Sequence, residues 1–152
     1  MHTHPRALQQ TATRPALPSW SLTHHASLRL LRWSLGLVFV WFGALKITGA
    51  TPVAALVGRT VPFLDRTWFV PALGIFEVML AIALVAGWQL RWVVTAMVAH
   101  LCGTFLVFVT QPNVAFQHGN PLLLTTEGEF VFKNIVLITA GLVVATQLPR
   151  RA

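Results

Sequence analysis

Four ionisable side chains interrupt long apolar stretches of this 152-residue sequence: Lys46, Glu77, His100 and Lys133. An ionised group inside a lipid bilayer is unfavourable by several kcal/mol unless it is paired or hydrated, so each residue of this kind needs a partner or a function. A buried carboxylate can pair with a lysine, and a carboxylate or an imidazole can also exchange a proton or hold a polar ligand. The chemistry open to the chain is therefore charge pairing, proton transfer or ligand binding inside a membrane.

The spacing of these residues allows one polar cluster. At about 1.5 Å per helical residue, Glu77 lies about 10 Å from the start of its apolar stretch, and His100 lies about 12 Å from the start of the next. Lys46 closes the first stretch, and Lys133 lies about one turn into the last. We therefore predict a buried polar cluster that is the candidate cofactor-binding site and consists of Lys46, Glu77, His100, Lys133 and Asn134.

Two interpretations of this cluster remain open. In one, Glu77 pairs with Lys46 or with Lys133, and the ion pair fixes the register of the helices. In the other, Glu77 and His100 bind a proton, an ion or the headgroup of a quinone. Cys102 lies about 200° around the helix from His100, and we expect it to be a small buried hydrophobic residue rather than a nucleophile.

The composition places these stretches in a membrane. Hydrophobic residues make up 55% of the chain and charged residues 10%, and the mean hydropathy is +0.68. Soluble domains carry about 25% charged residues. Four apolar runs are close to the roughly 20 residues that cross a bilayer as a helix, and none shows the two-residue alternation of a barrel strand. They are residues 28–47, 70–88, 92–109 and 130–147. The predicted fold class is an all-α membrane protein, a four-transmembrane-helix antiparallel bundle.

The connections between the spans predict how the helices are joined. Only a few residues separate Trp88 from Arg91, which forces an antiparallel hairpin. In the first outer loop, Thr51 as N-cap, Pro52 at the first helical position and Gly58 as terminator predict a short interfacial helix.

The second outer loop contains two turn-forming stretches, residues 111–113 and 119–121, which exclude a continuous helix. At its end, Thr126 and Glu129 have the spacing of a capping box and begin the last span.

Small residues accompany the polar ones at helical spacing, before or after them, a pattern typical of transmembrane helices that approach closely. We therefore expect the polar groups to face the interior of the bundle. The small residues are Gly36, Gly43, Gly74, Ala81, Gly103, Thr104 and Gly141.

The charged residues indicate the orientation of the chain. The formal net charge is +7, but most of the basic residues lie in the tails and short connections rather than along a stripe with exposed aromatic residues, so we expect no nucleic-acid binding. Seven of the 11 basic residues fall on the side of the termini, which predicts that both termini are cytoplasmic. These seven are Arg6, Arg14, Arg29, Arg32, Arg91, Arg150 and Arg151.

We expect a tail at each end of the chain. Residues 1–27 are predicted to form a disordered cytoplasmic tail, and residues 148–152 are predicted to form a short cytoplasmic tail. Four histidines, His2, His4, His24 and His25, lie in the first tail, and we expect a disordered segment there rather than a metal site. Cys102 is the only cysteine, so the chain alone can build no disulfide and no dithiol redox pair.

Three motifs occur in order along the spans. They are residues 32–46 with Gly36 and the run Trp-Phe-Gly-Ala-Leu-Lys, residues 73–77 with Leu-Gly-Ile-Phe-Glu, and residues 128–134 with Gly-Glu-Phe-Val-Phe-Lys-Asn. Together they resemble the DoxX/DoxD-like family of small four-helix bacterial membrane proteins, including its branch of reactive-chlorine-resistance membrane proteins. The resemblance covers roughly residues 29 to 147.

The resemblance implies a multi-pass protein of the bacterial inner, or plasma, membrane. Relatives include a subunit of a thiosulfate:quinone oxidoreductase and membrane components of redox-defence complexes. It also implies that Lys46, Glu77 and Lys133 occupy the family's recurring intramembrane polar positions. Ala81 stands where relatives often have glycine, and one cysteine cannot perform dithiol chemistry, so we do not expect thiosulfate oxidation.

These observations give a first functional hypothesis and two alternatives. The first is an accessory subunit of a membrane redox or oxidative-stress system, with no intrinsic cofactor, a quinone as ligand and a redox protein as partner. The alternatives are a small proton-coupled transporter that acts as a homo-oligomer, and a subunit of a quinone-linked oxidoreductase whose electron carriers a partner supplies. The sequence contains no specific motif for a catalytic triad, a phosphate loop or a metal, so we expect no enzyme activity from this chain alone.

Overall fold

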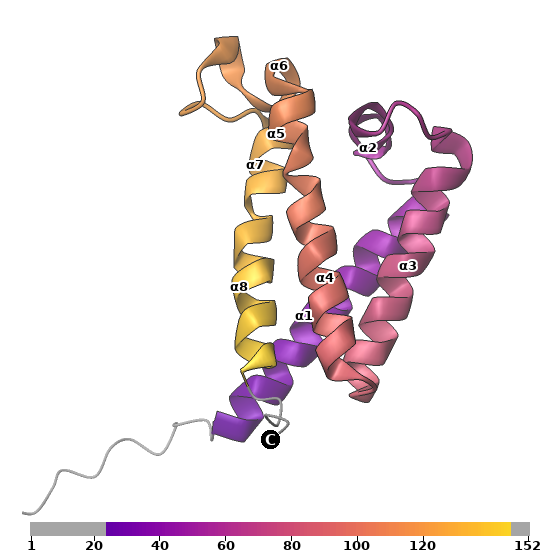
Figure 1. Cartoon of the computed structure of the whole chain (residues 1–152), viewed down its shortest axis with the longest axis vertical. Helices are drawn as coiled ribbons and strands as arrows, with labels where there is room; N and C mark the ends of the chain where they lie inside the picture. Colours follow the sequence, from indigo (N-terminus) through magenta and orange to yellow (C-terminus); the bar gives the residue numbers. More distant parts are fainter. Residues whose placement is uncertain (1–23, 147–152) are drawn as a thin grey trace, which may run out of the picture.

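The computed structural model describes residues 24–146, and these residues are almost entirely helical (Figure 1). Four stretches are long and apolar enough to cross a membrane: His24–Ile47, Arg66–Ala86, Leu90–Thr110 and Thr126–Ala145. The predicted all-α membrane fold with four spans is confirmed. The elements are α1 (His24–Ile47), α2 (Ala54–Thr60), α3 (Arg66–Ala86), α4 (Leu90–Thr104), α5 (Leu106–Thr110), α6 (Pro112–Ala115), η1 (Gln117–Gly119), α7 (Thr126–Phe132) and α8 (Asn134–Ala145).

Two of the spans begin about one turn before the predicted position. Helix α1 starts at His24, so His24 and His25 belong to a helix and not to the predicted tail. Helix α3 starts at Arg66, where the Asp65 side chain accepts a hydrogen bond of 2.8 Å from the backbone N–H of Thr67. This bond lowers the pKa of the Asp65 carboxyl. A helix can extend beyond its apolar run because polar residues form its first turn and its cap.

The remaining parts of the predicted tails, residues 1–23 and 148–152, lie outside the described residues, as do His2 and His4.

The four spans form two pairs that separate toward one end of the molecule. Helix α1 packs against α3, and α4 packs against α8 (Figure 1). Near the α3–α4 turn the two pairs share an apolar core with Leu35, Leu84 and Met97 at its centre. At the opposite end, where α2 and α6 lie, the pairs diverge (Figure 1). This divergence makes room for a cavity between them.

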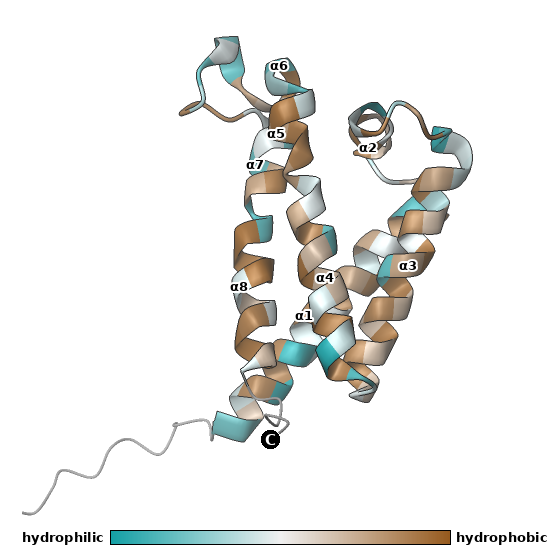
Figure 2. Ribbon diagram, viewed as in Figure 1, coloured by the Kyte–Doolittle hydropathy of each residue, from teal (hydrophilic) through white to brown (hydrophobic). Residues whose placement is uncertain are grey.

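The outside of the helices is apolar, as a lipid-facing surface requires. Figure 2 shows hydrophobic residues along all four spans and hydrophilic residues mainly near the ends of the spans and in the connections. Large side chains such as Leu37 (68% exposed), Ile82 (61%) and Val136 (67%) point outward. A soluble protein of this size rarely exposes so much contiguous apolar surface. The bilayer is therefore the environment that fits this fold.

Glycines let α1 and α3 approach closely. A Cβ atom at Gly43 would lie 2.7 Å from the backbone oxygen of Gly74, and one at Gly74 would lie 2.5 Å from the backbone oxygen of Gly43. Gly36 makes a similar contact with Val85. Gly103 differs, since a Cβ atom there would meet no heavy atom within 4 Å. The expectation that small residues mark close helix contacts therefore holds for α1 and α3 and is wrong for Gly103.

The predicted hairpin between the second and third spans is present. Gly87 ends α3 in the left-handed conformation, with a φ of +79°, and α4 begins at Leu90. Arg32 of α1 binds the same end of α3, since its Nη2 atom donates to the backbone oxygen of Val85 over 3.2 Å. The first three spans are thus tied together at this turn.

The short helix of the first outer loop is present, but its predicted ends are wrong. Helix α2 begins at Ala54 after Val53, so Thr51 is not its N-cap. Gly58 lies inside the helix and does not terminate it. A Cβ atom at Gly58 would lie 2.7 Å from the Cδ atom of Arg66, so this glycine serves the contact between α2 and α3.

The cap of the last span lies one residue earlier than predicted. The hydroxyl oxygen of Thr125, not of Thr126, accepts from the backbone N–H of Gly128 over 3.1 Å. The Thr125 hydroxyl also donates to the backbone oxygen of Val114, which fixes the loop against α6. The sequence pattern could not show the hydrogen bond between Thr125 and Val114, and this bond is the reason that Thr125 and not Thr126 caps the helix.

We predict that Gly43→Ala lowers the free energy of unfolding by about 1 to 3 kcal/mol, because the added methyl group would force α1 and α3 apart. The matched control is Gly103→Ala, which has open space and gains about 1 kcal/mol of helix propensity. Thermal unfolding in detergent micelles, followed by circular dichroism, measures both. Equal melting temperatures for the two variants would contradict the close contact.

Candidate functional site

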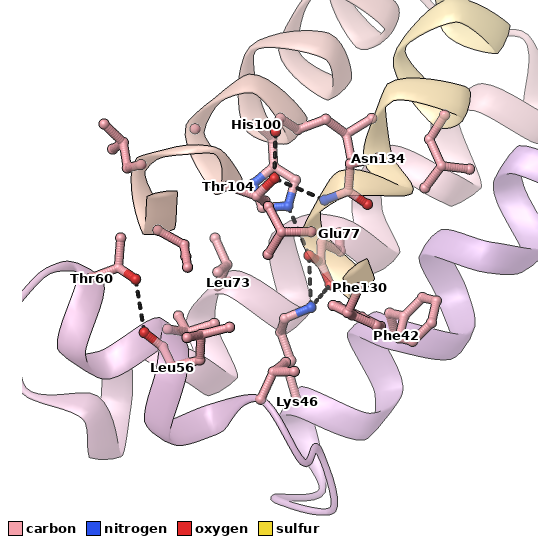
Figure 3. A pocket seen from close by; sticks show the side chains of 18 of the residues that line it. Phe42, Lys46, Leu56, Thr60, Leu73, Glu77, His100, Thr104, Phe130 and Asn134 are labelled. Atoms are coloured by element: carbon pink, nitrogen blue, oxygen red, sulfur yellow. Dashed lines mark hydrogen bonds and ion pairs between the residues drawn. The ribbon is translucent and has the colours of Figure 1, made fainter. Parts of the chain in front are cut away.

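Glu77 is the centre of a buried ionic network (Figure 3). The Nζ atom of Lys46 lies 2.9 Å from Oε1 and 2.7 Å from Oε2 of Glu77. Both residues are buried, with 7% of Lys46 and 5% of Glu77 exposed. Lys46 and Glu77 each lie about one turn from the contact between Gly43 and Gly74, on opposite sides of it, because α1 and α3 are antiparallel. The glycines bring the two helix backbones close enough for the side chains to meet.

His100 of α4 completes the network. Its Nε2 atom lies 2.8 Å from Oε1 of Glu77. The rings of Phe39 and Phe76 face the imidazole edge-on, with centroid distances of 6.2 and 5.9 Å. The carboxylate and the two aromatic rings fix the orientation of the imidazole. The network thus joins three helices, α1, α3 and α4.

A second polar contact links α4 to α8. The Nδ2 atom of Asn134 donates to the hydroxyl oxygen of Thr104 over 2.8 Å, and this hydroxyl donates to the backbone oxygen of Leu101 over 2.6 Å. The contact lies where both spans are interrupted, between α4 and α5 and between α7 and α8. Asn134 is therefore near the ionic network but has a partner of its own.

Lys133 does not join the ionic network. It is exposed, and within residues 24–146 it forms no ion pair. Of the two lysines that the sequence offered as the partner of Glu77, the structure selects Lys46. Lys133 lies at the interruption between α7 and α8, where its long side chain can reach toward water or a ligand.

All five predicted site residues line one cavity of about 650 Å³ (Figure 3). The cavity lies between the two helix pairs, and α2 forms part of its wall. Most of the other lining residues are apolar, and Phe42 and Phe130 pack edge to face there with centroids 5.4 Å apart. The polar residues of the wall are Lys46, Thr60, Glu77, His100, Thr104, Lys133 and Asn134.

Gln111 ties α2 to the end of α5. Its Nε2 atom donates to the backbone oxygen of Leu56 over 2.9 Å and to the hydroxyl of Thr60 over 2.8 Å. In the sequence, Gln111 belongs to a turn-forming stretch, and its spacing does not connect α2 with the site. Only the adjacent Pro112 signalled the end of a helix there, and nothing in the spacing could show a contact that spans more than 50 residues.

The expectation for Cys102 is wrong. The cysteine is exposed and not buried, because the position opposite His100 on α4 faces away from the bundle. Gly103, its neighbour, lines the cavity instead.

We predict that Glu77→Ala destabilises the protein by about 3 to 5 kcal/mol, because it leaves the buried Lys46 without a partner. Glu77→Gln is milder, since the amide oxygen still accepts from Lys46. Lys133→Met is the matched control and leaves the stability unchanged. Chemical unfolding in mixed micelles measures all three, and a loss for Lys133→Met as large as that for Glu77→Ala would contradict the assigned pairing.

The comparison with known protein families agrees with this architecture. The model of the DoxX family matches residues 27–110, which include α1 from its fourth residue on, α2 to α5 and thus Lys46, Glu77 and His100. The motif at residues 128–134 lies beyond the matched segment. No curated protein and no solved structure matches the chain. The family match covers more than half of the sequence, and the chain belongs to the DoxX family.

Proposed function

We propose that this DoxX-family protein is an accessory membrane subunit of a redox or oxidative-stress system and that its cavity holds the headgroup of a lipid-soluble quinone. The observation that carries the proposal is the cavity itself, which combines apolar walls with a few fixed polar groups. Its volume of about 650 Å³ falls within the range of small-molecule sites.

The lining suits a molecule with a polar ring and an apolar tail. Phe42, Leu73 and Phe130 offer apolar contacts for a ring and an isoprenoid chain. Lys133 can donate a hydrogen bond to a ring oxygen, and His100 and Asn134 add polar atoms to the wall beside it. Ubiquinone and menaquinone are lipid-soluble molecules of this class and would reach the cavity through the bilayer.

The side chains at the site hold a ligand and a proton but carry no electrons. Lys46, Glu77 and His100 are not redox groups, and Cys102 faces away from the cavity. Electron transfer to or from a bound quinone would therefore need a redox protein as partner. This is the reason for proposing an accessory subunit.

We also propose that the protein lies in the bacterial inner membrane with both termini in the cytoplasm, as the distribution of the 11 basic residues favours. The wide end of the bundle, with α2 and α6, then faces the outer side. A reporter that is active only in the cytoplasm should be active when it is fused to either terminus. Activity of a reporter that works only outside the cytoplasm, at either terminus, would contradict this orientation.

Two adjacent substitutions test quinone binding. Gly103→Leu places a side chain into open space at the cavity wall and should weaken binding of a short-tailed ubiquinone at least about tenfold. Cys102→Leu puts the same side chain on the exposed face and should leave binding unchanged. Quenching of tryptophan fluorescence in detergent measures the affinity. Absence of binding by the folded wild-type protein would refute the proposal.

Proton-coupled transport is a second candidate, which the contact between Glu77 and His100 favours. The two groups lie 2.8 Å apart inside the spans and could pass a proton between them. Four spans are few for a transporter, so this function would need a homo-oligomer. Proteoliposomes with the wild-type protein would then show a proton flux that is absent with Glu77→Gln. Equal flux with the wild type and with Glu77→Gln would contradict proton-coupled transport.

A further inference from the structure

The proton positions in the ionic network follow from its geometry. Both oxygens of Glu77 accept from the Lys46 ammonium, which is the arrangement of an ionised carboxylate. An ionised carboxylate only accepts hydrogen bonds. The Nε2 atom of His100, 2.8 Å from Oε1, must therefore carry the hydrogen in this contact.

The other ring nitrogen of His100 is an acceptor when the imidazole is neutral. The Lys46 ammonium already balances the charge of the Glu77 carboxylate, so the network needs no second cation, and with its hydrogen on Nε2 the ring keeps a free lone pair on Nδ1. Nδ1 forms no hydrogen bond with any residue from 24 to 146, and His100 lines the cavity. Glu77, Phe39 and Phe76 hold the ring in place. The cavity wall thus offers a fixed acceptor at this position.

Asn134 provides a second acceptor, its Oδ1 atom. The hydroxyl of Thr104 uses its only hydrogen to donate to the backbone oxygen of Leu101. Its contact with Asn134 must therefore be made by the Nδ2 amide of Asn134. The Oδ1 atom of Asn134 then remains, and no side chain or backbone group in the described part of the chain donates to it.

The other polar groups of the wall are paired or can only donate. The hydroxyl of Thr60 donates to the backbone oxygen of Leu56. Two of the three hydrogens of the Lys46 ammonium are directed at Glu77, and one of the two Nδ2 hydrogens of Asn134 goes to Thr104, so each group keeps one hydrogen. A ligand hydroxyl group can accept from such a donor and can also donate to His100 Nδ1 or Asn134 Oδ1, whereas a carbonyl oxygen satisfies the donors alone.

From this we propose that the cavity selects the reduced, hydroxyl-bearing form of its ligand, a hydroquinone, over the oxidised quinone. His100 Nδ1 and Asn134 Oδ1 are the two acceptors for its hydroxyl groups. The inference rests on the proposed function, because it concerns the same cavity and the same class of ligand. A quinone carbonyl would place an acceptor against an acceptor, which leaves a buried polar group unsatisfied.

The test compares three probes with the same decyl tail: a benzoquinone, its hydroquinone and the dimethyl ether of that hydroquinone. Titration calorimetry under argon, with the full chain in nanodiscs, gives the three affinities. We expect the hydroquinone to bind at least about tenfold more tightly than the other two. The ether replaces the two hydroxyl hydrogens by methyl groups and can only accept hydrogen bonds, and the quinone, which has no added methyl groups, controls for their size.

Variants show whether the two acceptors carry the selection. In His100→Leu and in Asn134→Leu the ratio of hydroquinone to ether affinity should fall toward one. Cys102→Leu, on the exposed face of α4 outside the cavity, should keep the ratio. A merely structural role would weaken all three probes alike and leave the ratio unchanged, so this result would overturn the assignment of the acceptors.

The outcomes for the wild-type protein separate the two proposals. Equal binding of the three probes, or tighter binding of the quinone, would overturn the selection and leave quinone binding intact. Binding of none of the probes by the folded protein would overturn the proposed function and the inference with it.

Discussion

The contact between Lys46 and Glu77 is the constraint on which the rest of this structure depends. Two opposite charges in a low-dielectric interior must find each other, because either one alone would be very unfavourable there. The distances of 2.7 and 2.9 Å show that the lysine engages both carboxylate oxygens. The charges fix the relative position of α1 and α3, and the imidazole of His100 then fixes α4 against the same carboxylate.

The packing of the backbone and the pairing of the charges support each other. Gly43 and Gly74 bring α1 and α3 into direct contact, and Lys46 and Glu77 lie about one helical turn to either side of this contact. At the narrow end, Leu84 and Met97 are fully buried between the helices, whereas at the wide end the helix pairs diverge. The result is a bundle that is closed by apolar packing at one end and holds a cavity with a polar wall at the other.

Much of this arrangement follows from residue types and spacing. Apolar runs of about 20 residues predict the spans, and the isolated charges predict Glu77, Lys46 and His100 as a cluster, because lipid leaves such groups few alternatives. Spacing alone could not choose between Lys46 and Lys133, since both reach the same depth. The choice depends on the contact at Gly43 and Gly74, which is a property of the packed helices.

Other features depend on contacts between distant segments, which spacing does not encode. The bond from Gln111 to Leu56 makes α2 part of the cavity wall, and the bond from Thr125 to Val114 moves the cap of α7 by one residue. The spacing predicts that Cys102 lies on the side of α4 away from His100, and because that side faces out of the bundle the cysteine is exposed and not buried.

A double-mutant cycle between Lys46 and Glu77 tests the central contact most directly. The free energies of unfolding of the wild type, Lys46→Met, Glu77→Gln and the double variant give the coupling energy between the two side chains. The account predicts a coupling above about 1 kcal/mol for this pair and a value near zero for the parallel cycle between Lys133 and Glu77. A coupling near zero for Lys46 and Glu77, or a larger one for Lys133, would contradict it.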